Sequence, residues 1–332
     1  MTESTIFDVI VIGGGAAGLS AAVTLGRARR SVLVIDAGEP RNAPAAGVHG
    51  FLTRDGTPPR ELVREGRAEA ERYGVRFVDA RATSAHRIDG GFAVETVETV
   101  EAVEAVEAVE SGETYRARRL VVATGLVDEM PQVDGLAERW GRDAIHCPYC
   151  HGWEVRDRAI GILATGPRAI HQALMFTQWS DSVTLFTHTA PTLGEEDREK
   201  LEALGVPIID GVITKLTVEN DELTGVELAD GVTHPIDVLV IGARMRARSD
   251  VLESLGVLAT EHEMGVGTHL ESAPGGATSI DGVWVAGNVT DLMAQVVVAA
   301  AAGMAVGAQV NAHLIEEEVR DAVARHRRTL KS

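Results

Sequence analysis

The chain contains two cysteines, Cys147 and Cys150, which stand three residues apart in the sequence HCPYCH. A structural zinc site commonly takes four ligands from two CxxC pairs. This chain has no second pair, and the adjacent Cys150 and His151 would not easily share one metal, so we predict no metal site. CxxCH is also the attachment motif of c-type haem. Haem attachment normally accompanies export, and residues 1–7 lack the basic segment and cleavage site of a secretory signal.

Thiol redox chemistry is the interpretation that we favour for this pair. Two cysteines at this spacing can close a small, reducible disulfide. If Cys147 lies near the start of a helix, its pKa falls and it becomes a better nucleophile. The alternative is a pair of inert, buried cysteines. His151 is a candidate general base, because histidine titrates near pH 6.5. Its alternative role is structural, as a helix-start residue whose ring bonds a backbone carbonyl.

A glycine motif near the N-terminus predicts a dinucleotide site. Gly13, Gly15 and Gly18 follow an apolar run at 7–12 and precede a helical stretch at 19–29. A second apolar run at 31–35 ends at Asp36. The first glycine permits a sharp turn, the second lets a pyrophosphate approach, and the third lets the helix pack closely. Asp36 can accept hydrogen bonds from ribose hydroxyls. A glycine-rich packing turn, the alternative, does not account for Asp36.

A second strand–turn–helix–strand unit occupies residues 159–186. We expect strands at 159–163 and 182–186, a turn at 164–169 and a helix at 170–179. Two such units predict an α/β protein with two Rossmann-like nucleotide-binding domains. The turn 123–125, after a predicted strand at 115–123, and Gly242, after a predicted strand at 238–241, are candidate hinges. The repeat at 96–110 is expected to form an expanded hairpin arm or loop.

The amino-acid composition limits the kinds of partner that the protein can bind. The 332 residues carry a net charge of −18, which disfavours nucleic acid and anionic membrane surfaces as partners. The run 293–310 has no charged residue. It is rich in Ala, Val and Gly and contains Gln295 and Gln309, so we predict a fully buried helix rather than a membrane span. We expect a cytoplasmic protein.

Together these motifs resemble the low-molecular-weight thioredoxin reductase family of flavoproteins over nearly the whole chain. The resemblance includes GGGAAG with Asp36, the turn 123–125, CPYC, and the late sequence VAGN at 285–288. It implies that FAD binds a domain formed by 1–127 and 249–332, and that an inserted domain, 128–248, carries the CxxC. It also implies that Cys147 exchanges with substrate while Cys150 faces the flavin. The implied cofactor-binding residues are Gly13, Gly15, Ala16, Ala17, Gly18, Asp36, Thr124, Gly125, Gly287, Asn288, Gln295 and Val296.

Several positions depart from the reductase pattern. The second glycine motif reads ATGPRA at 164–169, so Ala164 replaces the tight-turn glycine and Pro167 lacks a backbone N–H. The basic cluster expected for the NADPH 2′-phosphate reads His188-Thr189-Ala190. Both changes predict poor NADPH binding, although Arg168 could contact a phosphate in another pose. Asn288 replaces the usual Asp, and its amide can still bond the ribityl chain.

CPYCHGWE, with His151 in place of the reductases' Asp, resembles the small-molecule dithiol oxidases that close disulfides in gliotoxin-type and holomycin-type natural products. The resemblance implies an FAD-dependent dithiol oxidase that uses O₂ as acceptor and acts as a homodimer. His146 and His49 are expected to be structural or flavin-adjacent. The rivals are a disulfide reductase fed by NADPH or another donor, and a non-enzymatic FAD-containing redox sensor. The sequence does not identify the dithiol.

Overall fold

The computed structural model describes residues 6–98, 112–166 and 168–331. The chain divides into two compact units. The first unit comprises Met1–Arg41, Arg60–Val127 and Met245–Ser332, and the second comprises Asn42–Pro59 and Asp128–Arg244. These ranges differ from the expected domain ranges at 42–59 and 245–248. The predicted hairpin arm at 96–110 lies mostly outside the described residues, which resume at 112.

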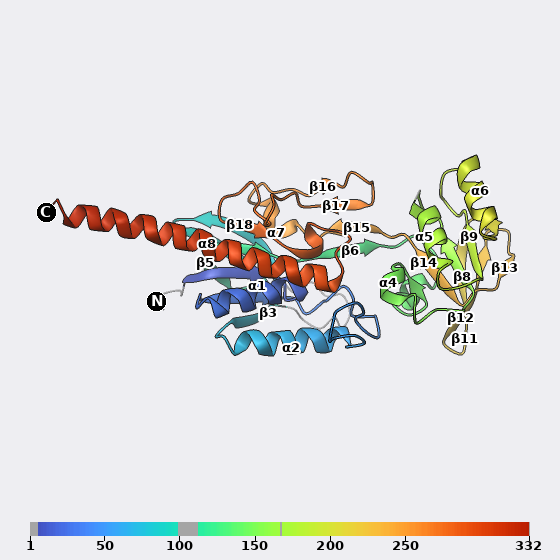
Figure 1. Ribbon diagram of the computed structural model, residues 1–332, viewed down its shortest axis with the longest axis horizontal. Coiled ribbons are helices and arrows are strands. Elements are labelled where there is room, and N and C mark those ends of the chain that lie inside the picture. The colour runs from blue at the N-terminus through green and yellow to red at the C-terminus, as the bar shows by residue number, and fades with distance from the viewer. Residues whose placement is uncertain (1–5, 99–111, 167, 332) are drawn as a thin grey trace. The chain divides into compact units, whose positions relative to one another are not determined.

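The sheet of the first unit has a parallel core in the order β3-β2-β1-β5-β18, and β4 pairs antiparallel with both β3 and β5 (Figure 1). The strands are β1 (Ile6–Ile12), β2 (Val32–Asp36), β3 (Arg76–Ile88), β4 (Gly91–Glu98), β5 (Thr114–Val122) and β18 (Val283–Val285). Runs of Val, Ile and Leu on β1 and β2 are buried on both faces, as a parallel sheet covered on both sides requires. The predicted strands at 7–12, 31–35 and 115–123 are confirmed.

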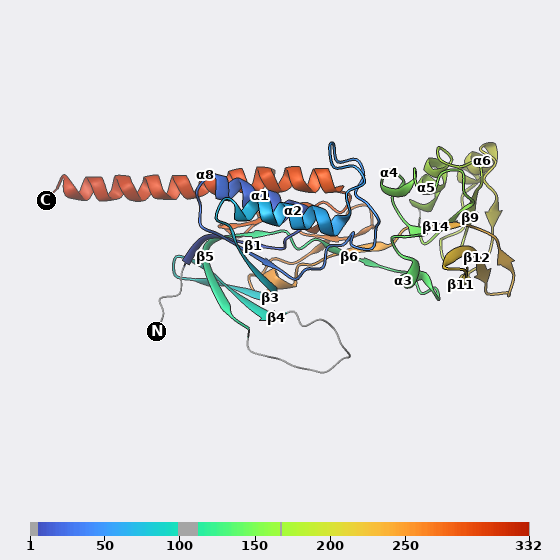
Figure 2. The same cartoon turned by 90° about the horizontal axis from the view of Figure 1, so that it is seen from below.

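Three helices lie on one face of this sheet: α1 (Ala16–Arg27), α2 (Pro59–Glu71) and α8 (Val296–Thr329) (Figure 2). One core cluster packs α1 and α8 against the sheet through residues such as Val11, Leu25 and Val306. A second cluster covers the other face, where α7 (Asp250–Glu253) contributes Val251 and Leu252. The first unit is therefore a three-layer structure.

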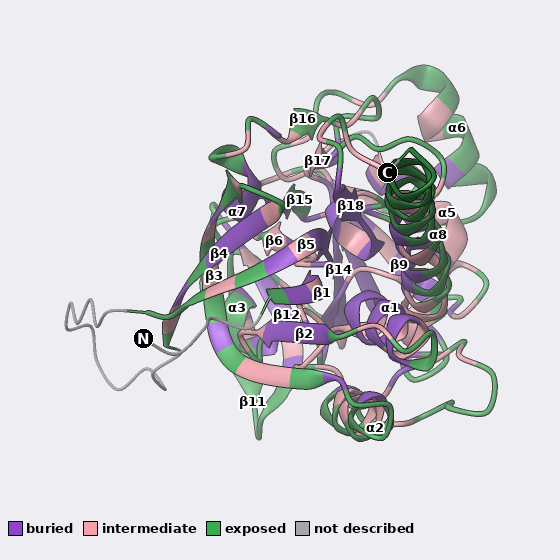
Figure 3. Ribbon diagram, turned by 90° about the vertical axis from the view of Figure 1, so that its left-hand side faces the viewer, coloured by how far each residue is buried: buried purple, intermediate pink, exposed green. Residues whose placement is uncertain are grey.

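Helix α8 contradicts the prediction of a fully buried helix. Only 28% of its 18-residue apolar window is buried. The buried residues form one narrow stripe, and beyond Leu314 the helix is mostly exposed (Figure 3). The reason is that α8 packs along α1 on one side only, through Ala299, Gly303, Val306, Gly307, Val310 and Leu314. By length and composition alone α8 could cross a membrane.

The second unit repeats the arrangement with an all-parallel sheet in the order β10-β9-β8-β14-β7. Its strands are β7 (Ala144–Ile145), β8 (Ile160–Leu163), β9 (Val183–Phe186), β10 (Ile208–Ile209) and β14 (Val238–Ile241). Its helices are α3 (Leu136–Arg139), α4 (Pro148–His151), α5 (Arg168–Phe176) and α6 (Glu195–Ala203), and a small antiparallel sheet joins β11 (Ile213–Glu219), β12 (Glu222–Leu228) and β13 (Thr233–His234). The predicted α/β class with two Rossmann-like units is confirmed.

A four-stranded sheet contains two of the four places where the chain passes between the units, at 127–128 and 244–245. Its order is β16-β17-β15-β6. The strands are β6 (Leu126–Glu129), β15 (Arg244–Ala247), β16 (Thr260–Glu261) and β17 (Gly267–His269). The predicted hinge at 123–125 directly precedes β6, and Gly242 lies two residues before β15, so these two crossings are made by paired strands.

Candidate functional site

The first glycine loop lies where β1 and β5 end side by side. Gly13 has a φ of +103°, and a Cβ there would collide with the Ala123 carbonyl. A Cβ on Gly18 would lie 3.3 Å from the Val11 side chain and would overlap the Gly13 backbone. This is the topological switch point of the sheet, where ligands of doubly wound folds bind. Gly13 and Gly18 therefore have the turn and packing roles that the sequence predicts.

The same loop leaves room for a phosphate. The position of a Cβ on Gly15 is open, with nothing in the described structure within 4 Å. Gly15 is the N-cap of the 12-residue helix α1, and no side chain caps the first turn, which contains Ala16 and Ala17. Uncapped N–H groups at a helix start bind anions through hydrogen bonds and the helix dipole. The residues present therefore fit the pyrophosphate of a dinucleotide.

Asp36 lies beside this loop and accepts a hydrogen bond from the Gly14 N–H at 2.9 Å. A Cβ on Gly14 would lie 2.7 Å from the Asp36 carboxyl carbon. Gly14 is a site residue that our sequence reasoning missed, although the run of three glycines carried the signal. The bond fixes the carboxylate next to the glycine loop, where a ribose would need it.

Thr124 and Gly125 follow β5 at the same edge. The Thr124 hydroxyl donates a hydrogen bond to the Arg248 carbonyl at 2.5 Å, and the Arg248 N–H donates to the Gly125 carbonyl at 3.0 Å. Gly125 has a φ of +71°, which favours glycine. These contacts anchor residues 124–125 to the returning chain. The cofactor-contact role of both residues stays a prediction.

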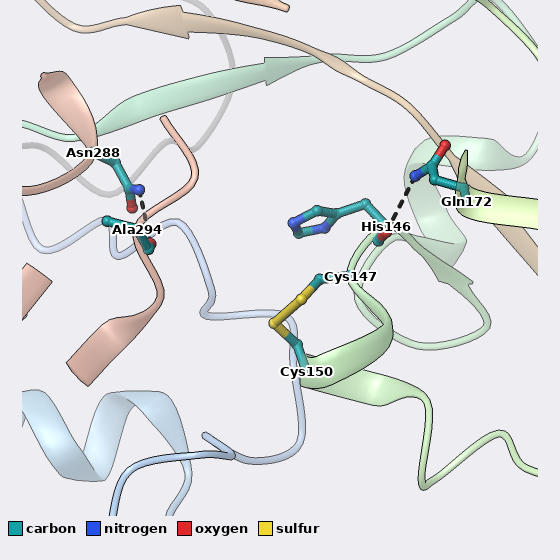
Figure 4. The surroundings of a disulfide bond; sticks show 6 residues. All are labelled: His146, Cys147, Cys150, Gln172, Asn288 and Ala294. Atoms are coloured by element: carbon teal, nitrogen blue, oxygen red, sulfur yellow. Dashed lines mark hydrogen bonds between the residues drawn. A yellow bond between two sulfur atoms is a disulfide. The ribbon is translucent and has the colours of Figure 1, made fainter. Parts of the chain in front are cut away.

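The late motif forms a loop at the start of α8. The Asn288 side-chain amide donates to the carbonyls of Asp291 at 3.0 Å and Ala294 at 2.9 Å (Figure 4). A carboxylate could not donate these bonds, so the loop in this conformation suits Asn at this position. Gln295 is the N-cap of α8 and no side chain caps the first turn, so the Val296 N–H is suited to an acceptor on a ligand. Gly287, with a φ of +78°, packs against the Ala17 methyl group.

The corresponding switch point of the second unit, where β8 and β14 end, lacks the turn glycine, although the position of a Cβ on Gly166 is as open in the described structure as that on Gly15. Ala164 replaces the turn glycine and is completely buried. The Thr165 hydroxyl donates to the Gly242 carbonyl at 3.0 Å, and a Cβ on Gly242 would lie 3.4 Å from the Gln172 amide oxygen. Pro167, the other predicted defect, lies outside the described residues. Thr165 and Gln172 were not singled out from the sequence.

His188 occupies the place where the reductase pattern has a basic cluster. Its Nδ1 accepts a hydrogen bond from the Ile213 N–H at 3.1 Å. Burial lowers the pKa of His188, which favours the neutral ring. A neutral imidazole that is engaged with the backbone offers no positive charge to a 2′-phosphate. The geometry thus agrees with the sequence prediction of poor NADPH binding, which stays a prediction.

Cys147 and Cys150 form a disulfide with their Cα atoms 5.2 Å apart (Figure 4). Cys147 is the N-cap of α4, and Pro148 occupies the first position of this four-residue helix. Proline is favoured there because its fixed φ suits a helix start. Cys147 therefore lies at the start of a helix, the condition that the sequence analysis set for a lowered thiol pKa.

His146 precedes the disulfide and is held from two sides. Its ring stacks on Trp140, with ring centroids 5.4 Å apart. Its carbonyl accepts a hydrogen bond from the Gln172 amide at 3.2 Å (Figure 4). Gln172 also donates to the Ile241 carbonyl at 3.4 Å. These contacts support the expectation that His146 is structural, and they tie the start of the CxxC turn to the end of β14.

His151 ends the CxxC helix, and both of its ring nitrogens are buried without a hydrogen-bond partner among the described residues. The structural alternative, a ring bonded to a backbone carbonyl, is therefore wrong for the described chain. Burial lowers the pKa of His151, Glu154 partly opposes that shift, and His49 adds to it. The ring is neutral at neutral pH and can accept a proton. His49 itself lies between Asp55, at 3.2 Å, and Glu154, at 3.5 Å.

Known proteins resemble this chain over nearly its whole length. The family model described as pyridine nucleotide-disulphide oxidoreductase matches residues 7–303. "Thioredoxin reductase sirT" of Leptosphaeria maculans is 33% identical over 329 residues, covering 93% of this chain and 95% of that protein. "Thioredoxin reductase tcpT" of Claviceps purpurea is 30% identical and covers 96% and 97%. Among solved structures, HlmI is 40% identical, with a TM-score of 0.87 and 99% coverage of both chains.

The two-unit fold, the CxxC disulfide and these matches define a class. The chain belongs to the pyridine nucleotide-disulphide oxidoreductase family. Within that family it is a thioredoxin reductase-like flavoprotein and an oxidoreductase, so the predicted resemblance and enzyme class are confirmed.

Proposed function

We propose that the protein is an FAD-dependent dithiol oxidase that closes a disulfide in a small-molecule dithiol. The overall reaction removes two electrons and two protons from the dithiol and transfers them to O₂, which gives the disulfide and H₂O₂. The observation that carries this proposal is the contrast between the two switch points. The first has its turn and packing glycines with Asp36 beside them, whereas in the second Ala164 replaces the turn glycine and a neutral His188 stands where a 2′-phosphate would need positive charge.

The residues that would hold FAD belong to the first unit. The α1 N-terminus with Gly15 suits the pyrophosphate, Asp36 the ribose, and the α8 N-terminus the flavin ring. Asn288 keeps its side-chain oxygen available for the ribityl chain while its amide is bonded to the loop. When bound, FAD accepts two electrons and passes them to O₂. The chain's own residues must carry out the thiol–disulfide exchange that comes before this electron transfer.

Thiol–disulfide exchange opens the reaction. A substrate thiolate attacks Cys147, the Cys147–Cys150 bond breaks, and Cys150 leaves as a thiolate. The second substrate thiolate then attacks the substrate sulfur of the mixed disulfide, which releases the product and the Cys147 thiolate. Each attacking thiol must lose a proton. His151 is neutral, and its ring nitrogens have no hydrogen-bond partner within the part of the chain that the structure describes, so it serves as the base.

A disulfide reductase is the second candidate, and the relatives' printed names, which are thioredoxin reductases, favour it. It would need an electron donor that reaches the flavin, either NADPH or another carrier. A non-enzymatic flavin-containing redox sensor is the third candidate. The oxidase accounts better for a second switch point that lacks the turn glycine and the basic cluster, because an enzyme fed by dithiols has no use for NADPH.

Oxygen uptake and anaerobic flavin reduction distinguish the three candidates. We expect dithiothreitol to reduce the flavin and to drive catalytic oxygen consumption with stoichiometric H₂O₂. We expect NADPH at micromolar concentrations to do neither. Fast, saturable flavin reduction by NADPH would overturn the oxidase in favour of the reductase. A flavin that turns over with neither donor would leave the sensor.

We also propose that the protein is a cytoplasmic homodimer that does not span a membrane. Among the apolar side chains that α8 exposes, Ile315, Val319 and Val323 recur every four residues, and Met304 lies eleven residues, about three turns, before Ile315 on the same side of the helix. They form a stripe that a second copy of the chain can cover. The net charge of −18 also disfavours an anionic membrane surface.

A further inference from the structure

A pocket of about 400 Å³ opens beside the CxxC helix, entirely within the second unit. Pro148 and Tyr149, which directly follow Cys147, form part of its wall. Its volume falls in the range of sites that bind small molecules. A molecule seated there would contact the two residues between the cysteines of the disulfide.

Three aromatic side chains line this pocket: Tyr149, Trp153 and Trp179. Tyr149 and Trp153 are 64% and 66% exposed, which is unusual for large aromatic rings. Such rings on the surface, gathered at one concave site, mark a place where a partner covers them. The aromatic wall therefore favours a ligand with a flat or apolar ring.

The chain holds these rings in position. Tyr149 meets Trp179 edge to face, with ring centroids 5.9 Å apart. The Arg156 guanidinium lies 4.2 Å from the centroid of the Trp153 ring. A Cβ on Gly152 would lie 2.8 Å from the Trp179 ring, so glycine is what allows that ring to pack against the CxxC helix. Preorganised rings lose little entropy when a ligand stacks on them.

The remaining polar wall is acidic. Asp55 and Glu154 are both in the wall, and His49 lies between them, 3.2 Å from Asp55 and 3.5 Å from Glu154. Two carboxylates and one imidazole leave this wall negative in either protonation state of His49. A ligand that carries a carboxylate would therefore meet like charge at short range.

We propose that this pocket seats the body of the dithiol substrate, and that it selects uncharged or cationic, ring-bearing dithiols against anionic thiols. The inference rests on the proposed function and deepens it, because it names the chemical class of the substrate. Aromatic rings hold the ring of the substrate, and Asp55 and Glu154 repel carboxylates. The cell's abundant acidic thiols are thereby kept from the disulfide.

The charge selection is tested with dihydrolipoamide and dihydrolipoate, which share one dithiol and differ in an amide or a carboxylate. At pH 8 and low salt we expect kcat/KM for the amide to exceed that for the acid about tenfold. Glu154→Gln should bring this ratio toward one. Glu219→Gln, which removes an exposed carboxylate from β11 of the same unit, is the matched control and should leave the ratio unchanged.

The ring selection is tested with benzene-1,2-dimethanethiol and butane-1,4-dithiol. We expect Trp153→Ala to raise KM for the aromatic dithiol about tenfold more than KM for the aliphatic one, and Trp153→Phe to restore most of the preference. As a binding readout that needs no turnover, benzene-1,2-dimethanol should quench tryptophan fluorescence in the unaltered protein and much less in Trp153→Ala.

The outcomes separate the two proposals. Flavin reduction by every dithiol with equal efficiency, unchanged in both pocket variants, would overturn the pocket assignment and leave the oxidase intact. Flavin reduction by no dithiol at all would overturn the oxidase and the substrate class together. A preference for dihydrolipoate would reverse the charge argument.

Discussion

At the residue scale, His151 is the side chain whose environment departs most from that of an ordinary surface histidine. Both ring nitrogens are buried and lack a partner in the described chain, and burial lowers the pKa of the ring. An unpartnered buried polar group is costly, so its retention points to a chemical use. The charged groups that act on it are Glu154 and His49.

We predict that His151→Ala slows flavin reduction by dithiols by about 10²–10⁴. The loss should shrink as the pH approaches the thiol pKa near 8.5, where substrates ionise unaided. In the unaltered enzyme the acidic limb of the rate should lie below pH 6.5, because the pKa of His151 is lowered. Stopped-flow flavin reduction against pH measures both effects, and an unchanged rate at pH 7 would remove His151 from the mechanism.

The same pKa shift makes the stability of the folded protein depend on pH. Since the folded protein binds the His151 proton less tightly than the unfolded chain, stability is full above about pH 6.5 and falls as the pH drops through the lowered value. His151→Gln should flatten this part of the stability profile in urea unfolding followed between pH 5 and 7.

The two cysteines should differ in role, as the family resemblance implies. We predict that Cys147→Ser leaves Cys150 as a thiolate with a long-wavelength charge-transfer absorbance, and that Cys150→Ser lacks this band but keeps Cys147 open to alkylation. Both variants should lose dithiol turnover. Absorbance spectra and iodoacetamide labelling test this, and the band in Cys150→Ser instead would exchange the two roles.

The site residues show which features the sequence alone can predict. Gly13, Gly18 and the disulfide follow from local rules, because a turn, a close packing contact and a CxxC spacing are short-range requirements. The hydrogen bond from Thr165 to Gly242 and the lone ring of His151 are different. Both depend on which side chains the sheet brings together across many residues, and no pattern in the sequence encodes that.

At the scale of elements, the contact between α1 and α8 holds the start of α1, and with it the glycine loop, in position. Gly303 faces the backbone of Ala17, and a Cβ there would lie 2.8 Å from the Ala17 Cα. Gly307 similarly approaches Thr24 and the Ala21 carbonyl. The sequence analysis predicted a helix only over the uncharged run 293–310. The charged residues that follow continue the same helix to Thr329, so its full length was not predicted.

We predict that Gly303→Ala destabilises the first unit by about 1–3 kcal/mol and weakens FAD binding, although Gly→Ala in a helix normally stabilises by roughly 1 kcal/mol. The new methyl group must push α8 away from α1. Gly66→Ala on α2 is the control, because its Cβ would meet the flexible end of Leu19 at 2.9 Å. Thermal unfolding and flavin titration measure the difference, and a more stable Gly303→Ala would contradict the packing argument.

The second half of α8 is fixed to its own unit by ion pairs. Glu318 pairs with Arg30 at 2.5 Å and with Arg118 at 2.9 Å, and Arg118 also pairs with Asp8 at 2.8 Å. Arg30 and Arg118 lower the pKa of Glu318 to about 2. The pairs therefore persist in moderately acidic solution, and α8 keeps its apolar stripe in a defined direction.

At the scale of the whole molecule, the exposed apolar stripe of α8 is the surface through which we expect two chains to associate. We predict that the protein has twice the mass of one chain in solution, and that Ile315→Glu, a charge in the middle of the stripe, makes it monomeric. Val218→Glu, at an exposed valine of the second unit, is the control and should leave the mass unchanged. Light scattering after size exclusion measures this, and a monomeric unaltered protein would refute the dimer.

The loss of the turn glycine at the switch point of the second unit has a metabolic consequence for the proposed oxidase. If the second unit does not dock a reduced nicotinamide, as we predict, the proposed oxidase is insulated from the cell's main supply of reducing power. Its direction then depends on dithiol and oxygen alone, so it can oxidise thiols in a compartment where NADPH is plentiful. The changes at Ala164 and His188 would then restrict electron flow to one direction, from dithiol to oxygen, although the fold keeps the architecture of a second nucleotide domain.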